Sequence, residues 1–141
     1  MAELLDDIGT YLVAQSVGTL YVAGLSSSSV AIYLGMMREE NDRNVTLIEL
    51  PGLPPTETMG DSTAPIYATH RLQVLCRHVA EDYVNALALA NQVYDALVLV
   101  ANETINGTYY LKVSATQTPT LLEWDDEHRA VFACTYLVVR G

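Results

Sequence analysis

The stretch IYATHRLQVLCRHVAEDYVNALALANQVYDALV, residues 66–98, decides the fold. Residues 66–77 alternate between two parities as a β-strand does, with Arg71, Gln73 and Arg77 on one side and Leu72, Val74 and Cys76 on the other. From about Ala80 to Val98 the spacing predicts a helix whose apolar stripe is Tyr83, Leu87, Ala90, Tyr94 and Leu97, widened by Ala86 and Val93. We expect Leu87, Tyr94 and Leu97 to pack on a sheet that contains Val74.

The flanking segments predict the rest of the architecture. Upstream lie a helix at about Glu3–Gln15, short β-leaning pieces at Leu20–Ala23 and Ala31–Leu34, a polar connector at Met37–Asn44 and a strand at Val45–Leu50. Downstream lie a turn at Asn102–Thr108, a strand at Tyr109–Thr116, a polar turn at Trp124–Arg129 and a closing strand at Ala130–Val139. Strands that follow strands predict an α+β fold, with an antiparallel or mixed β-sheet packed against two main helices on one face.

Size and composition indicate one folded domain spanning residues 1–141. The chain has 141 residues, half of them hydrophobic, and a mean hydropathy of +0.19. This apolar content excludes a disordered chain. The opening MAELLDD is not typical of a signal peptide, and no apolar run is long enough for a membrane span. We expect Cys76 and Cys134, which lack CxxC spacing, to be buried free thiols, with a disulfide as the alternative.

The charge balance argues against a nucleic-acid or membrane partner. Seventeen acidic residues stand against seven basic ones, for a formal charge of −10. A surface that binds phosphates needs clustered Lys and Arg, but the chain has a single lysine, Lys112, and scattered arginines.

A long loop is predicted at residues 51–65, which hold four of the five prolines. Proline cannot donate to a β-ladder, so this segment is not expected to pair. Loops of this length in small domains are often functional. We therefore take Pro54, Pro55, Met59 and Asp61 as candidate residues of a subunit or partner interface.

The sequence offers little for catalysis or for metal and cofactor binding. Walker A, GxGxxG, HExxH and GxSxG patterns are absent. Cys76 and His78 could share one strand face, but a zinc site needs three or four ligands. The sequence motifs thus predict no catalytic residue, no metal ligand and no cofactor.

The acidic run after Trp124 is better explained as a hairpin turn than as a cation site. Calcium loops place carboxylates at alternate positions around a glycine, and this run does neither. The turn is polar, projects between two strands and carries both charge signs. We take its five residues as further candidates for an interface: Asp125, Asp126, Glu127, His128 and Arg129.

Several local phrases, in order, resemble the tail terminator and minor capsid protein family of long-tailed bacteriophages. They are residues 4–12 (LLDDIGTYL), residues 45–52 (VTLIELPG) with the Pro54-Pro55 loop, residues 72–77 (LQVLCR) with Asp82-Tyr83 and the helix to Leu97, and residues 118–140 with the final strand. The piece from Val17 to Leu34 departs from the family pattern by its length, so the number of strands there stays open.

The resemblance implies a structural virion protein of the tail and neck, assembled in the host cytoplasm. Such a protein is expected to form a homo-hexameric ring that caps the finished tail tube, stops its polymerisation and joins the tail to the head. Its partners would be further copies of itself, the tail tube protein and a head-completion or stopper protein, with DNA only passing through the lumen. The alternatives are another head–tail connector component (a stopper or tail-completion protein) and a small ligand-binding or enzymatic α+β domain with residues 51–65 as a lid.

Overall fold

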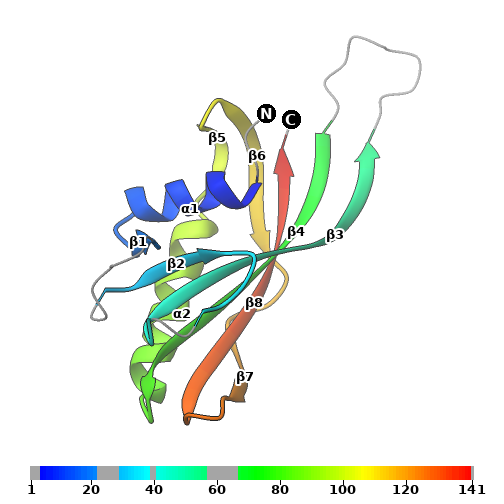
Figure 1. Ribbon diagram of the computed structural model, residues 1–141. Coiled ribbons are helices and arrows are strands. Elements are labelled where there is room, and N and C mark those ends of the chain that lie inside the picture. The colour runs from blue at the N-terminus through cyan, green and yellow to red at the C-terminus, as the bar shows by residue number, and fades with distance from the viewer. Residues whose placement is uncertain (1–3, 22–28, 39–40, 57–66, 141) are drawn as a thin grey trace, which may run out of the picture.

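Two long antiparallel strands form the centre of the sheet, β4 (Tyr67–Ala80) and β8 (Arg129–Arg140). The computed structural model describes residues 4–21, 29–38, 41–56 and 67–140 (Figure 1). In the β4–β8 register Leu72 lies opposite Tyr136 and Val74 opposite Cys134, and all four side chains are buried. The predicted alternation of β4 is therefore confirmed.

The remaining strands extend the sheet on both sides. β3 (Asn44–Thr56) pairs antiparallel with β4, and β2 (Ala31–Leu34) and β1 (Thr19–Leu20) follow in parallel. The other edge of β8 is shared: β7 (Thr120–Trp124) pairs with its first part and β6 (Thr108–Ala115) with its last part. β5 (Ala101–Ile105) pairs with β6, so the order is β1-β2-β3-β4-β8-β6-β5 with β7 beside β8.

Both helices pack on the same face of this sheet, which we call the helix face. α1 (Leu4–Ala14) lies against β1, β2, β3 and β5, and α2 (Tyr83–Leu97) lies against β4, β8 and β6 (Figure 1). One cluster of buried apolar side chains joins both helices to the sheet. The Tyr11 hydroxyl donates a hydrogen bond of 2.8 Å to the carbonyl of Ala96, which ties α1 to the end of α2. The α+β class and the placement of the helices are confirmed, and the sheet is mixed; ring formation stays a prediction.

The prediction that residues 51–65 cannot join a ladder is wrong for residues 51–56. They continue β3, with Leu53 opposite Thr69 and Thr56 opposite Tyr67. The register shifts on both sides of Leu53, so Pro51, Pro54 and Pro55 fall at positions without a register partner. Proline is tolerated at bulges and on edge strands, where no ladder hydrogen bond is lost. Residues 57–66 lie outside the described residues.

The predicted helix at about 80–98 begins three residues later than expected. Asp82 caps it by accepting a hydrogen bond of 3.0 Å from the Asn85 backbone N–H. The buried stripe is Ala86, Leu89, Ala90, Val93, Ala96 and Leu97. Tyr83, assigned to the stripe from the sequence, is 43 % exposed, and Leu87 and Tyr94 are half-buried. The predicted stripe is centred one residue too late in the sequence, because the buried positions 86, 89, 93 and 96 each precede a predicted one.

The strands β5 and β7 could not be predicted from the sequence, because they carry no period-two signal. Most side chains of β5 and β7 are exposed, so neither strand alternates. The predicted turn at Asn102–Thr108 is thus confined to Asn106 and Gly107, both with positive φ, as a two-residue hairpin requires. Cys76 and Cys134 are buried free thiols, as predicted.

Candidate assembly surfaces

The predicted hairpin turn joins β7 to β8, and Asp125 organises it. The Asp125 Oδ1 accepts hydrogen bonds from the backbone N–H groups of Glu127 (3.0 Å) and Arg129 (2.9 Å). Its Oδ2 accepts one of 2.7 Å from the Arg129 Nε. Partial burial disfavours the charged carboxylate, but the hydrogen bonds from Arg129 and Glu127 outweigh it and lower the pKa of Asp125. Asp125 and Arg129 therefore hold the turn together.

A network of buried arginines continues from this turn. Arg129 is 3 % exposed and donates a hydrogen bond of 2.7 Å to the Asp42 carboxylate. Arg77 is 1 % exposed and donates to the backbone carbonyls of Arg38 (3.1 Å), Asn41 (2.8 Å) and Asp42 (3.1 Å). The segment that links β2 to β3 is thereby bound to the sheet side opposite the helices. The predicted solvated connector at Met37–Asn44 is wrong for Asn41 and Asn44, which are buried.

Three residues of the turn point to solvent and are available for contact. Asp126, Glu127 and His128 are exposed, and only Glu127 approaches the network, at 3.4 Å from the Arg129 guanidinium. The His128 backbone carbonyl accepts a hydrogen bond of 2.8 Å from the Glu81 N–H, which anchors the turn to the start of α2. The five candidates of the turn thus divide into an internal pair and an exposed trio.

The candidate interface residues that the structure describes lie at opposite ends of the sheet. Pro54 and Pro55 are in the last part of β3, at the upper end in Figure 1, whereas the β7–β8 turn is at the lower end. Met59 and Asp61 lie outside the described residues. β8 runs from one end to the other over eleven residue steps, or about 36 Å of strand. The fold therefore separates Pro54 and Pro55 from the five candidates of the turn.

An exposed aromatic pair, not anticipated from the sequence, lies next to the turn. Tyr83 and Trp124 stack with ring centroids 6.4 Å apart, and Tyr83 also meets the edge of the buried Phe132 at 5.1 Å. Both remain exposed, at 43 % and 46 %, and their sequence neighbours Val84 and Leu122 are exposed as well. We call these four residues, Tyr83 with the adjoining Val84 and Trp124 with Leu122 two positions before it, the aromatic patch. The tryptophan next to an acidic turn was a usable signal, because Trp and Tyr dominate binding hot spots.

The sheet side away from the helices carries a second surface. In the register Leu50, Arg71 and Leu137 form one row across β3, β4 and β8, and Val139 lies beside Lys112. Neither helix packs on this side, where the aliphatic side chains are half-buried and both cations are exposed. We call this surface the apolar–basic patch: Ile48, Leu50, Arg71, Lys112, Leu137 and Val139.

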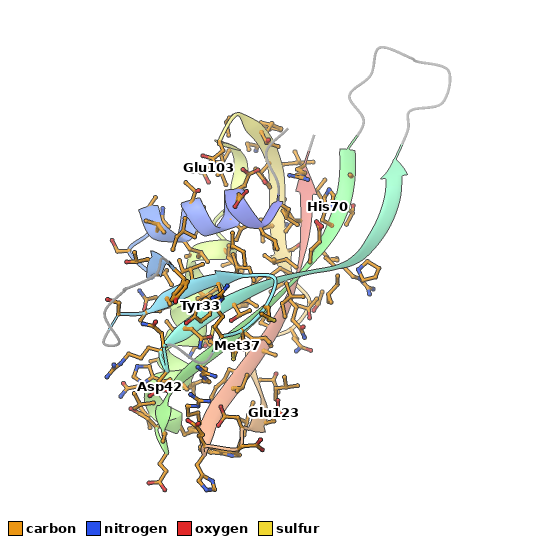
Figure 2. The ribbon with its side chains drawn as sticks, in the orientation of Figure 1. Tyr33, Met37, Asp42, His70, Glu103 and Glu123 are labelled. Carbon is orange, nitrogen blue, oxygen red and sulfur yellow. The ribbon has the colours of Figure 1, made fainter. Side chains whose placement is uncertain are left out.

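A buried polar cluster lies on the helix face near the end of β8. Asp7 of α1 is fully buried and accepts a hydrogen bond from the Tyr110 hydroxyl, and the Arg140 guanidinium lies 3.7 Å from the same carboxylate oxygen. The Arg140 Nε donates to the His70 Nε2 at 3.3 Å. Burial and the Arg140 charge lower the pKa of His70, and burial and Asp7 raise the pKa of Tyr110. Figure 2 shows His70 at the upper end of the sheet.

This cluster ties α1 to the sheet and does not form an open active site. Asp7 and Tyr110 have no exposed surface for a substrate to reach. Among the described residues no group of three or more His, Cys, Asp or Glu side chains could hold a metal ion. Burial raises the pKa of the Cys76 thiol, which disfavours the reactive thiolate. Within the described part of the chain, no helix is long and apolar enough to cross a membrane.

Comparison with known proteins identifies both a family and a fold. A family model described as "Bacteriophage tail terminator protein" matches residues 11–139. A chain of a solved structure, the "Virion of native gene transfer agent (GTA) particle", superposes with a TM-score of 0.61 at 18 % identity, over 98 % of this chain and 95 % of that chain. No curated protein sequence matches.

Proposed function

Because the chain belongs to the bacteriophage tail terminator family, we propose that it caps the completed tail tube as a ring and stops tube polymerisation. Its family makes it a structural component of the phage tail, and the same membership argues against an enzyme. The observation that carries the proposal is the family match, which spans nearly all of the described helices and strands. In this role the other face of the ring joins the tail to the head.

The distribution of side chains supports a ring with two different faces. Such a ring needs head-to-tail contacts that close by rotation, together with one surface for the tube and another for the head. The chain presents polar and proline-rich segments at the two ends of its sheet, about 36 Å of strand apart. We propose that Pro54, Pro55, Met59 and Asp61 contact a partner at one end, and that Asp126, Glu127 and His128 do so at the other.

The two remaining candidates of the turn act in this proposal by shaping it. Asp125 and Arg129 form hydrogen bonds within the chain, and Arg129 is almost fully buried. Their part in assembly is to hold Asp126 and Glu127 in place. Exposed charges of this kind contribute little affinity but help to fix the register between partners.

The proposed partners are further copies of the chain in a hexamer, the tail tube protein and a head-completion or stopper protein. One hydrophobic cluster joins all the main elements, which favours a chain that acts in the ring as one domain. DNA passes through the lumen without specific binding in this proposal. The net charge of −10 favours sliding, because like charges repel the phosphates.

Removal of the gene from the phage tests the proposal, with tail lengths measured on electron micrographs of the particles. A terminator predicts tails of uncontrolled length or heads without tails. Tails of normal length that fail to join heads would instead identify a stopper or tail-completion protein. Wild-type particle yield without the protein would contradict every role in the neck.

A further inference from the structure

The two exposed surfaces of the chain have complementary chemistry. The aromatic patch is apolar and is flanked in sequence by six carboxylates, those of Glu81, Asp82, Glu123, Asp125, Asp126 and Glu127, of which Asp125 is paired with Arg129. The apolar–basic patch combines aliphatic side chains with the exposed cations Arg71 and Lys112. Its rows are Ile48–Gln73–Thr135, Leu50–Arg71–Leu137–Ser114 and Thr69–Val139–Lys112, and no carboxylate occupies these positions. Because the chain as a whole carries a charge of −10, the apolar–basic patch is a surface that does not repel the acidic surface of another copy.

One copy of the chain cannot bring these surfaces together. Trp124 lies opposite Ala130 on β8, and Leu137 lies seven residues further along the same strand, or about 23 Å. Trp124 also points to the helix face, since Ala130 belongs to the core, whereas Leu137 is on the other side of the sheet. Two patches on opposite sides of one chain can meet only between copies.

We propose that the aromatic patch of one copy docks on the apolar–basic patch of the next copy. Tyr83 and Trp124 cover the aliphatic side chains of β3 and β8, and the acidic turn lies beside Arg71 and Lys112. The contact is heterologous, so its repetition produces a closed ring when the rotation fits. This inference rests on the proposed ring and names the surfaces that build it.

Substitutions on both sides test the contact by the dissociation constant of the oligomer. Trp124→Ala should raise it about 30-fold or more, as expected of a central aromatic anchor. Lys112→Glu should raise it roughly fivefold, because a rim attraction becomes a repulsion. Arg38→Glu changes the net charge equally at an exposed position outside both patches, over the Tyr21 ring, and should leave the constant within about twofold. Equal effects of Lys112→Glu and Arg38→Glu would overturn the proposed pairing.

A photo-crosslink locates the contact directly. A photoreactive benzophenone amino acid is placed at position 122 instead of Leu122, so that Tyr83 and Trp124 stay unchanged. A second copy of the chain carries an isotope label, which distinguishes crosslinks between chains from those within one chain. The proposal predicts adducts on β3, β4, β6 or β8 of the other copy at the apolar–basic patch. Native mass spectrometry of the same sample reports the oligomer. An oligomer with adducts elsewhere, or without adducts, overturns this inference alone, whereas monomers at every concentration overturn the ring as well. DNA binding of the wild type and of Lys112→Glu is measured in parallel. If the wild type binds DNA and the variant does not, while the oligomer is unchanged, the cations bind a nucleic acid and the proposed pairing is overturned.

Discussion

Replacing Arg77 with methionine should destabilise the fold strongly, because the Arg77 guanidinium binds residues between β2 and β3 to the sheet. The side chain is 1 % exposed and donates three hydrogen bonds of 2.8–3.1 Å to the carbonyls of Arg38, Asn41 and Asp42. Methionine keeps most of the aliphatic stem but provides no donor. The three carbonyls then lose a charged partner, and the Asn41 carbonyl loses it at a buried position.

The magnitude follows from those three bonds. A hydrogen bond from a charged group contributes about 1.5–3 kcal/mol, and removal of one member of a buried charged network costs about 3–5 kcal/mol. Relief of the buried charge offsets part of the sum, so we expect a loss of about 3–5 kcal/mol. Arg71→Met is the matched control, because Arg71 lies on the same strand and the same side but is exposed. Its effect should stay within about 0.5 kcal/mol.

Urea titration of both variants, at a protein concentration where the chain is monomeric, measures the two free energies of unfolding. The slope against urea should not change, so the difference appears in the midpoint. A loss below about 1 kcal/mol for Arg77→Met, or equal losses for the two variants, would refute the role assigned to the network.

Three further predictions concern the turn and the core. Reversal of Asp126 and Glu127 to lysine should leave the monomer folded, as measured by circular dichroism, yet lower the yield of particles with normal tails on electron micrographs. Asp125→Lys should instead unfold the monomer, because it places a cation beside Arg129. The lowered pKa of Asp125 means that its carboxylate stabilises the fold above about pH 4, its unfolded value, and that this contribution is lost as the pH falls through the folded pKa. The stability gap between wild type and Asp125→Asn should thus narrow from pH 7 to pH 3, and a constant gap would exclude the carboxylate's charge as its cause. Leu97→Ala should cost about 2–5 kcal/mol, because Leu97 is fully buried, and Leu87→Ala about half as much; equal costs would contradict the helix orientation.

The elements that could be predicted from the sequence are those with a strong period. The alternation of β4 and the 3.6-residue spacing of the two helices predict their type, and the order of elements predicts that the helices share one face. The turn predicted at Asn102–Thr108 contains the observed turn residues Asn106 and Gly107, although its first residues belong to β5. The error at Tyr83 arose because an aromatic side chain fits a helical stripe equally well when it only covers the edge of the core, as Tyr83 covers Phe132.

The parts that escaped prediction depend on tertiary context. Pro51, Pro54 and Pro55 argued against a strand, yet β3 accommodates them because it is an edge at that point and shifts its register twice. The burial of Arg77 and Arg129 could not be predicted, since nothing in the sequence reveals that backbone carbonyls and two aspartates converge on them. The candidate turn was located correctly, but its division into internal Asp125 and exposed Asp126 required the three-dimensional hydrogen bonds.

The growth of tail tubes in the presence of the purified protein tests the proposed capping most directly. Tube subunits from the same phage polymerise in vitro, the protein is added during elongation, and tube lengths are measured by negative-stain electron microscopy. Capping predicts that growth stops at an amount of protein equivalent to one ring per tube, with a ring visible at the tube end. Continued elongation at saturating protein, with bare tube ends, would contradict the account.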